Sequence, residues 1–128
     1  MNSASPFKRF VPGIVGTKFE KSTESYLNKS GLRTICRNYR CRAGEIDLVM
    51  DDGEFIVFVE VRYRRDDNYG NGLKSITAAK QRRIIRAATH FLAGKPELRD
   101  MPCRFDAVGV SGLDRRLKYD WIKVAFST

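Results

Sequence analysis

At 128 residues the chain is long enough for one domain with a single hydrophobic core, and it contains no repeat or low-complexity segment. Its 24 Lys and Arg residues outnumber its 15 Asp and Glu residues and give a formal net charge of +9. This excess favours a polyanionic partner, most often nucleic acid, over the alternative of a basic protein without such a partner.

The cysteines are Cys36, Cys41 and Cys103. An odd number without a secretory signal is typical of reduced thiols in the cytosol. A structural zinc site is not expected, because Cys36 and Cys41 have no second, closely spaced pair of Cys or His residues. Residues 10–15 are too short and too interrupted by Pro and Gly to form a signal peptide or a membrane span. We therefore expect a cytoplasmic protein that does not enter a membrane.

Residues 1–15 show no periodic pattern and are expected to form a flexible tail ahead of a single domain, residues 16–128. Helical spacing of apolar residues predicts a helix over residues 17–30. A Thr-x-x-Glu pattern at its start gives Glu20 a capping role, in which its carboxylate bonds back to the cap backbone. Glu24, one turn later, is expected to be a solvated charge.

Residues 32–42 are predicted to form a strand that ends in a basic run, Arg37, Arg40 and Arg42. Such a run is either a solvated edge or, beside a site that binds nucleic acid, a set of phosphate contacts. The pattern alone does not separate these two readings.

Two runs of alternating apolar residues flank an Asp-Gly dipeptide at residues 52–53, which is a strong hairpin signal because both residues tolerate a positive φ. A two-residue loop pairs Asp51 with Glu54. The same register places Asp47 opposite Phe58.

One face of this hairpin is then apolar and is expected to face the core; it contains Ile46, Leu48, Met50, Phe55, Val57, Val59 and Val61. The other face carries Glu45 opposite Glu60, with Asp47 as a diagonal neighbour of Glu60 at roughly 7–8 Å. Arg62 lies on the same face. Three carboxylates this close repel one another unless a cation lies among them, and a divalent metal ion is the simplest candidate.

A polar segment with two glycines follows at residues 63–72. Its glycine spacing fits neither a P-loop nor a dinucleotide fingerprint. A loop over a nucleic-acid groove is the expected role, with Tyr63 and Tyr69 available for base stacking and with Arg64 and Arg65 available for phosphates.

Residues 76–93 give the clearest helical pattern, with an apolar stripe along one face. Arg82, Arg83 and Arg86 lie mostly off this stripe. Lys80 shares the face of the apolar residues, so its side chain either bends outward to water or points towards the carboxylates of the hairpin.

Residues 103–110 and 118–126 are predicted to be strands joined by a hairpin loop. Asp106 in the first of them is either a further functional acid or a structural hydrogen-bond acceptor, which is the commoner role. The complete order is helix, three strands, helix and two strands. It predicts an α/β domain with a central mixed sheet flanked by helices.

The hairpin contains an acid, Asp47, followed after 12 residues by the Glu60-x-Arg62 pattern. This arrangement is typical of metal-dependent phosphodiester cleavage, in which two carboxylates hold Mg²⁺ or Mn²⁺ and leave positions for a phosphate oxygen and a water. A cation two residues after the second acid can orient that water or stabilise the phosphate. The spacing of Asp47, Glu60 and Arg62 alone is an unspecific signal. The strand register, the additional acids Glu45 and Glu20 and the basic surroundings strengthen the interpretation as a nuclease site.

Over about residues 16–126, the chain resembles the YraN family of small bacterial proteins. The residues that carry the resemblance are Gly44-Glu45-Ile46-Asp47-Leu48, Phe58-Val59-Glu60-Val61-Arg62, Tyr69-Gly70, Lys80-Gln81-Arg82-Arg83-Ile84, Cys103-Arg104-Phe105-Asp106 and Ala125-Phe126.

The resemblance implies membership of the restriction-endonuclease-like, PD-(D/E)XK superfamily, similar in outline to archaeal Holliday-junction resolvases, with an αβββαβ core. By position, it implies that Asp47 and Glu60 are metal ligands and that Glu20 is an additional acid of the catalytic site. Glu45, Lys80 and Gln81 match family positions without an assigned role.

Arg62 stands where the superfamily has a lysine. Lysine can lose its proton when desolvated, whereas arginine keeps it, so Arg62 can bind phosphate but is a poor general base.

The sequence supports three alternative hypotheses for the function. The first is a metal-dependent endonuclease acting on DNA, including branched or structured DNA, and the second is a non-catalytic nucleic-acid-binding protein that keeps the nuclease fold. The third is a protein-interaction module whose acids bind a basic partner. The small size favours a homodimer on DNA. The residues expected to bind nucleic acid are Arg40, Arg42, Arg64, Arg65, Arg82, Arg83 and Arg86.

Overall fold

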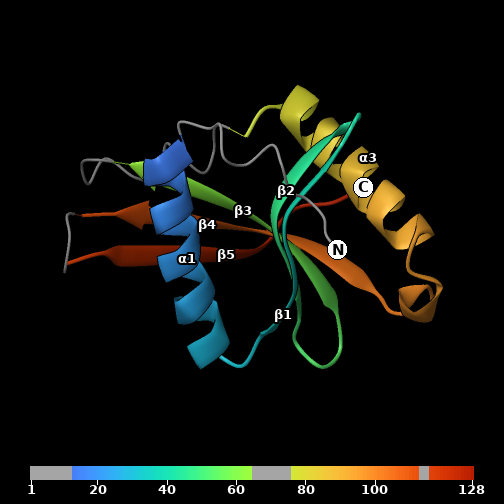
Figure 1. The fold of residues 1–128 in the computed structure, drawn as a ribbon, viewed down its shortest axis with the longest axis horizontal. Coiled ribbons are helices and arrows are strands. Elements are labelled where there is room, and N and C mark those ends of the chain that lie inside the picture. The colour runs from blue at the N-terminus through green and yellow to red at the C-terminus, as the bar shows by residue number, and fades with distance from the viewer. Residues whose placement is uncertain (1–12, 65–75, 113–115) are drawn as a thin grey trace.

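The computed structural model describes residues 13–64, 76–112 and 116–128 of the chain (Figure 1). Most of the predicted N-terminal tail and most of the predicted polar loop, including Arg65 and Tyr69, lie outside the described residues.

The helices and strands follow the predicted order. They are α1 (Gly13–Lys29), β1 (Arg33–Cys41), β2 (Gly44–Asp51), β3 (Ile56–Arg64), α3 (Ala78–Ala93), a 3₁₀ turn η2 (Pro96–Leu98), β4 (Cys103–Ser111) and β5 (Lys118–Phe126). The strands form one sheet in the order β1-β2-β3-β4-β5, in which β3 and β4 are parallel and the other neighbours are antiparallel. The predicted α/β class, with an αβββαβ core and a mixed sheet, is confirmed.

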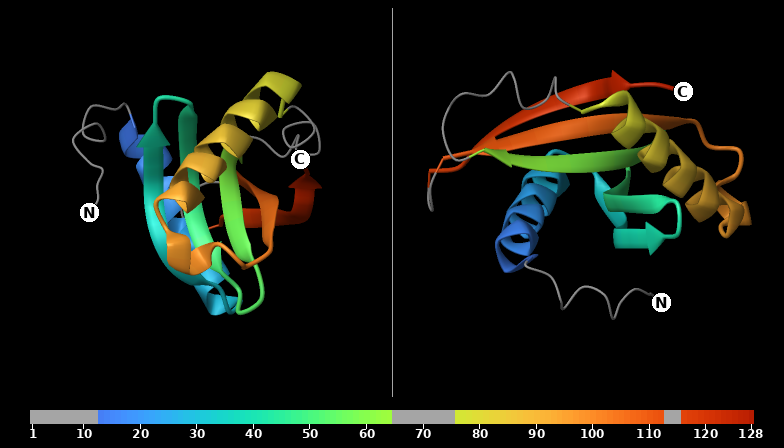
Figure 2. Two further views of the ribbon diagram at one scale, coloured as in Figure 1. Left: turned by 90° about the vertical axis from the view of Figure 1, so that its right-hand side faces the viewer. Right: turned by 90° about the horizontal axis from the view of Figure 1, so that it is seen from above.

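The parallel β3–β4 pair needs a crossover connection, and α3 lies on that connection. Figure 2 shows α1 and α3 on opposite sides of the β1–β2 hairpin, with a strongly twisted sheet. None of the described helices is long and apolar enough to cross a membrane.

Helix α1 begins at Gly13, inside the segment predicted as tail. Residues 13–16 contain two glycines and two β-branched residues, which are poor helix formers, so the sequence pattern placed the start too late. Thr17 is therefore inside the helix, and the capping-box role predicted for Glu20 is wrong. Glu20 is half-buried on α1 instead.

The central strands of the sheet are buried on both faces, which corrects the prediction of a single apolar face on the β2–β3 hairpin. On the α3 side the core includes Ile46, Val49, Ile56, Phe58, Ile84, Ala87, Phe91, Phe105 and Phe126. On the α1 side it includes Leu27, Leu32, Leu48, Met50, Val57, Val59, Val108 and Val110. The carboxylates of the hairpin therefore lie at one end of a largely apolar layer rather than on a polar face.

The β2–β3 loop is longer than predicted. The structure pairs Asp51 with Ile56 and Val49 with Phe58, so the predicted pairing of Asp47 with Phe58 is wrong. The cause is the Asp52 side chain, whose Oδ1 accepts hydrogen bonds from the backbone N–H groups of residues 54 and 55, at 2.8 and 2.7 Å. These bonds stabilise a four-residue loop.

This correction moves each partner by two residues, and a shift of two keeps every side chain on its original face. The new register brings Glu60, instead of Phe58, level with Asp47 and moves Glu45 away from Glu60.

Glu24 corrects another prediction. It is buried, not solvated, and accepts hydrogen bonds from Thr34 at 2.6 Å and from Arg37 at 2.9 Å. Burial alone would raise its pKa, but the bonds from Arg37 and Thr34 outweigh burial and hold the pKa below its ordinary value. These contacts connect α1 to β1 and give Arg37 a structural partner.

Asp106 is fully buried and has the structural role. Its carboxylate accepts hydrogen bonds from Arg104 at 3.1 Å, from the Trp121 indole at 2.9 Å and from the Val124 N–H at 3.0 Å. Arg104 also donates to Asp52 at 2.6 Å. The network connects the β2–β3 loop to β4 and β5.

We predict that Asp106→Ala lowers the free energy of unfolding by about 3–5 kcal/mol, because it leaves the half-buried Arg104 and Trp121 donors without this acceptor. Urea denaturation measures the change. Asp120→Ala, at an exposed position of β5, is the control and should shift stability by no more than about 0.5 kcal/mol. Equal stability of the two variants would contradict the structural role.

Candidate active site

The candidate site lies where β2 and β3 separate. Their ladder runs from the Asp51–Ile56 pair to the Leu48–Val59 pair. Beyond that point β3 stays paired with β4 as far as Ser111, and β2 stays paired with β1 as far as Gly44. Asp47 and Glu60 are the first residues past the end of the ladder, one on each strand.

Asp47 is only 7% exposed. Its Oδ2 accepts a hydrogen bond from the backbone N–H of Val61 at 2.8 Å, so the side chain bridges the two separating strands. Burial raises the pKa of Asp47 well above its ordinary value, the charges of Glu60 and Glu20 raise it further, and the Val61 N–H opposes them. The strands therefore hold this carboxylate where its negative charge is poorly compensated.

Glu60 is also only 7% exposed and has two cationic neighbours. Lys80 Nζ lies 3.3 Å from its Oε2, and an Arg62 guanidinium nitrogen lies 3.9 Å from the same oxygen. Burial raises the pKa of Glu60, and the opposing effects of Lys80 and Arg62 do not cancel it. The reading in which Lys80 points from α3 towards the carboxylates is the one that the structure shows.

The structure brings the other predicted acids near this pair without making them equal partners. Glu20 on α1 acts on Asp47 through its charge. The Glu45 side chain is half-exposed and forms an ion pair with Arg40 at 3.2 Å. Across residues 13–64, 76–112 and 116–128, no three His, Cys, Asp or Glu side chains are grouped so that they can hold a metal ion. The expected cluster of three converging carboxylates is thus absent from the described part of the chain.

The two buried carboxylates nevertheless fit a divalent cation by their chemistry. Hard cations take oxygen ligands, and Mg²⁺ in particular uses one or two carboxylates and keeps several waters. Asp47 and Glu60 offer carboxylate oxygens whose mutual repulsion a cation would relieve. They are the residues of this site that can hold such an ion.

Gln81 does not point at the acids. Its side-chain amide donates to the carbonyl oxygen of Ile76 at 3.0 Å and so supports the start of α3. The helix itself begins with Thr77 as its cap, whose side chain accepts from the Lys80 N–H. This cap fixes the turn from which Lys80 reaches Glu60.

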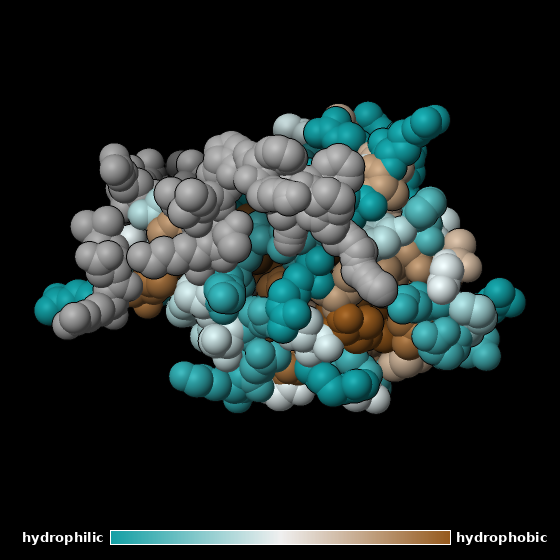
Figure 3. Space-filling model, viewed as in Figure 1, coloured by the Kyte–Doolittle hydropathy of each residue, from teal (hydrophilic) through white to brown (hydrophobic). Residues whose placement is uncertain are grey.

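Five of the seven arginines predicted to bind nucleic acid have described side chains, and these five lie on α3 and around the end of β1. Arg82, Arg83 and Arg86 are exposed on α3, and the surface over the first turns of this helix is hydrophilic (Figure 3). Arg40 and Arg42 are exposed at the end of β1. The side chain of Arg64 and all of Arg65 lie outside the described residues.

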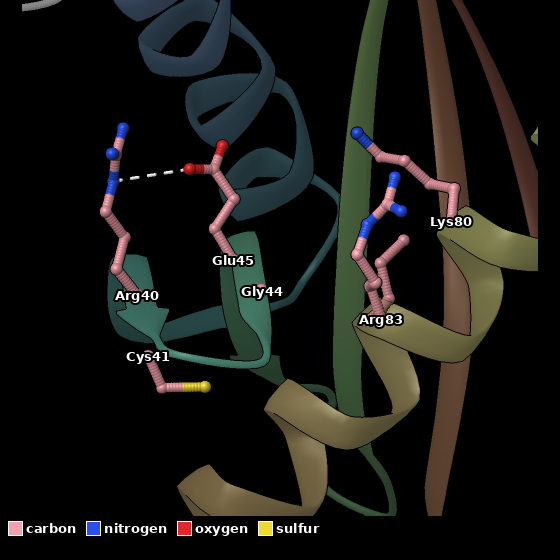
Figure 4. A pocket seen from close by; sticks show the side chains of 7 residues that line it. Arg40, Cys41, Gly44, Glu45, Lys80 and Arg83 are labelled. Carbon is pink, nitrogen blue, oxygen red and sulfur yellow. Dashed lines mark ion pairs between the residues drawn. The ribbon is translucent and has the colours of Figure 1, made fainter.

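A cavity of about 300 Å³ separates these two groups of arginines (Figure 4). It is lined by Arg40, Cys41, Gly44, Glu45, Lys80, Arg83 and Ile84. No sequence pattern had predicted this cavity. A signal was available in Gly44, since a glycine in a strand often marks a close backbone approach. A Cβ at this position would lie 3.0 Å from the Arg83 carbonyl oxygen.

Comparison with known proteins identifies relatives across most of the chain. Residues 19–110 match the model of a family described as uncharacterised protein family UPF0102. A UPF0102 protein of Nitrosospira multiformis is 50% identical over 114 residues, which cover 88% of this chain and 92% of that protein. A UPF0102 protein of Nitrosomonas europaea is 48% identical over 114 residues, covering 89% and 94%.

Among solved structures, Pyrococcus furiosus SfsA in complex with Ca²⁺ aligns with 85% of this chain and 62% of its own, at 17% identity and a TM-score of 0.38.

The raised pKa of Asp47 predicts a stabilising substitution. Because the folded pKa lies above the ordinary value of 3.8, the stability contributed by Asp47 is complete below that value and is lost as the pH rises through the folded pKa. Asp47→Asn keeps an acceptor for the Val61 N–H without the charge. It should raise the free energy of unfolding at neutral pH by roughly 0.5–2 kcal/mol, and the gain should vanish in acid.

Urea denaturation at a series of pH values measures this effect, with Asp120→Asn as the exposed control. A variant that is less stable than the wild type at neutral pH would show that the Asp47 charge is well compensated.

Proposed function

The chain belongs to the uncharacterised protein family UPF0102, and we propose that it is a divalent-metal-dependent nuclease that hydrolyses phosphodiester bonds in DNA. The YraN resemblance in its sequence is a resemblance to this family. Membership of the restriction-endonuclease-like superfamily is part of the proposal.

One observation carries the proposal. Two carboxylates, Asp47 and Glu60, are buried side by side at the end of the β2–β3 ladder, and both have raised pKa values. A protein gains no stability from this arrangement. Buried groups with pKa values shifted by desolvation and like charges are typical of functional sites.

The residues around the pair have distinct roles in the proposed reaction. Asp47 and Glu60 would hold the metal ion, Mg²⁺ or Mn²⁺, and Glu20 adds negative charge from α1. When bound, a divalent cation would lower the pKa of a water molecule and neutralise the charge that develops on the phosphate. Arg62 keeps its proton and therefore donates hydrogen bonds to the phosphate rather than accepting a proton from water.

The net charge of +9 and the arginines of β1 and α3 support a nucleic-acid substrate. Exposed Arg40 and Arg42 on one side and Arg82, Arg83 and Arg86 on the other lie on the two elements that flank the carboxylates. Branched or structured DNA remains the preferred candidate. A homodimer and a cytoplasmic location remain predictions.

A second function, a nucleic-acid-binding protein without catalysis, is favoured by Arg62. The lysine position of the superfamily motif is held by a residue that does not lose its proton. In this alternative the arginine surfaces bind DNA, and the carboxylates have no role in that binding.

We predict that the purified protein cleaves branched, nicked or single-stranded DNA in the presence of Mg²⁺ or Mn²⁺. Asp47→Ala and Glu60→Gln should each reduce the rate by at least about 100-fold, since each removes a ligand oxygen from the metal. Glu54→Gln, an exposed acid in the β2–β3 loop, should leave the rate unchanged. Cleavage that survives Asp47→Ala would refute the assignment of the site.

DNA binding separates the two functions if no cleavage is found. A nuclease should bind DNA more tightly with metal present, and Glu60→Gln should remove that dependence. Fluorescence anisotropy at several salt concentrations measures both effects. Binding that falls steeply with salt but is indifferent to metal and to Glu60→Gln would favour the non-catalytic protein.

A further inference from the structure

The cavity between the β1–β2 turn and α3 adjoins the acid pair but is not part of it. Figure 4 shows Arg40 and Glu45 on one wall and Lys80 and Arg83 on the other. Gly44 lies close to the backbone of Arg83, so the two walls of the cavity meet there. The cavity therefore forms where the β1–β2 turn packs against α3.

The charges of this cavity suit an anion. Three cations face one carboxylate, and Glu45 is paired with Arg40 at 3.2 Å. Glu45 therefore leaves the positive charge of Arg83 uncompensated in the cavity, and Lys80 is shared between the cavity and Glu60. The planar guanidinium of arginine matches the geometry of phosphate oxygens, and the volume of about 300 Å³ is ample for a phosphate group of a nucleic-acid strand.

Lys80 contributes both to the cavity and to the surroundings of the carboxylate pair. It lines the cavity, and its ammonium group also lies 3.3 Å from Glu60 Oε2. The side chain is 37% exposed and has a flexible four-carbon stem, so it can change its partner without moving the helix. As long as Lys80 is paired with Glu60, one positive charge of the cavity is directed towards the acids.

We propose that the cavity binds a nucleic-acid phosphate next to the acid pair, and that Lys80 moves from Glu60 to this phosphate when a divalent cation binds the acids. Before that movement Lys80 is a counterion of Glu60, together with Arg62. The inference rests on the proposed metal site. Its consequence is positive coupling: metal increases the affinity for DNA, and DNA increases the affinity for metal by the same factor.

The test measures metal and DNA binding separately. Calorimetry with Ca²⁺ or Mn²⁺ gives the metal affinity of the DNA-free protein. Anisotropy of a fluorescein-labelled duplex, with and without Ca²⁺, gives the coupling. For the wild type we expect Ca²⁺ to raise the DNA affinity by roughly 5- to 150-fold, the usual range of such couplings.

Lys80→Met should bind metal more tightly than the wild type, because the competing cation is gone, and should lose most of the coupling. Arg83→Met should bind metal as the wild type does, while its DNA affinity falls and the slope of log affinity against log salt decreases by about 1. Arg99→Met removes an exposed cation beyond the far end of α3 and is the matched control; it should change neither metal affinity nor coupling. Lys80→Gln replaces Lys80→Met if circular dichroism shows that the latter is unfolded.

The outcomes separate this inference from the proposed function. A wild type that binds no divalent cation would overturn both. A wild type that binds metal and DNA, with unchanged metal affinity and coupling in the folded Lys80 variants, would overturn the role of Lys80 alone. Unchanged DNA affinity in Arg83→Met would overturn the phosphate-binding cavity.

Discussion

The separation of β2 from β3 beyond the Leu48–Val59 pair is the constraint on which the rest of the site depends. Each strand is held by a different neighbour past that point, β2 by β1 and β3 by β4, so the two strands move apart while both remain hydrogen-bonded. The Asp47 side chain spans the opening by accepting the Val61 N–H. Helices α1 and α3 lie on opposite sides of the β1–β2 hairpin next to this opening (Figure 2).

This geometry places charge at the end of an otherwise apolar layer. Phe58, Phe91 and Phe105 pack in the layer on the α3 side, and Asp47 and Glu60 lie two residues along β2 and β3 from the buried Val49 and Phe58 of that layer. Burial and mutual repulsion both disfavour the ionised carboxylates. The fold tolerates them because the Asp106 network and the two apolar layers supply stability elsewhere. Such a local cost is typical of sites kept for function.

Much of the fold could be predicted from the sequence, because the spacing of apolar residues and the glycines that end helices and strands agree with the tertiary structure. The strands at residues 103–110 and 118–126 and the helix ending before Gly94 are examples. Errors arose where a side chain competes with a local rule. The Asp52 carboxylate stabilises a four-residue loop where the Asp-Gly pattern predicts two, and Glu24 is buried because Thr34 and Arg37, more than nine residues away, supply its hydrogen bonds. The prediction that Asp47 and Glu60 lie on the same face of the hairpin was correct only because the predicted register was wrong by two residues, which leaves each side chain on its face.

The contact of Lys80 with Glu60 shows what sequence pattern leaves open. Helical spacing identified a lysine on an apolar face, but its partner depends on how α3 crosses the sheet. In the proposed function, Asp47 and Glu60 form a divalent-cation site. Anomalous diffraction from a crystal soaked in Mn²⁺ tests it most directly. We predict an anomalous peak between the two carboxylates, with Lys80 displaced from Glu60; a well-diffracting soaked crystal with no peak there and with Lys80 still paired to Glu60 would contradict the account.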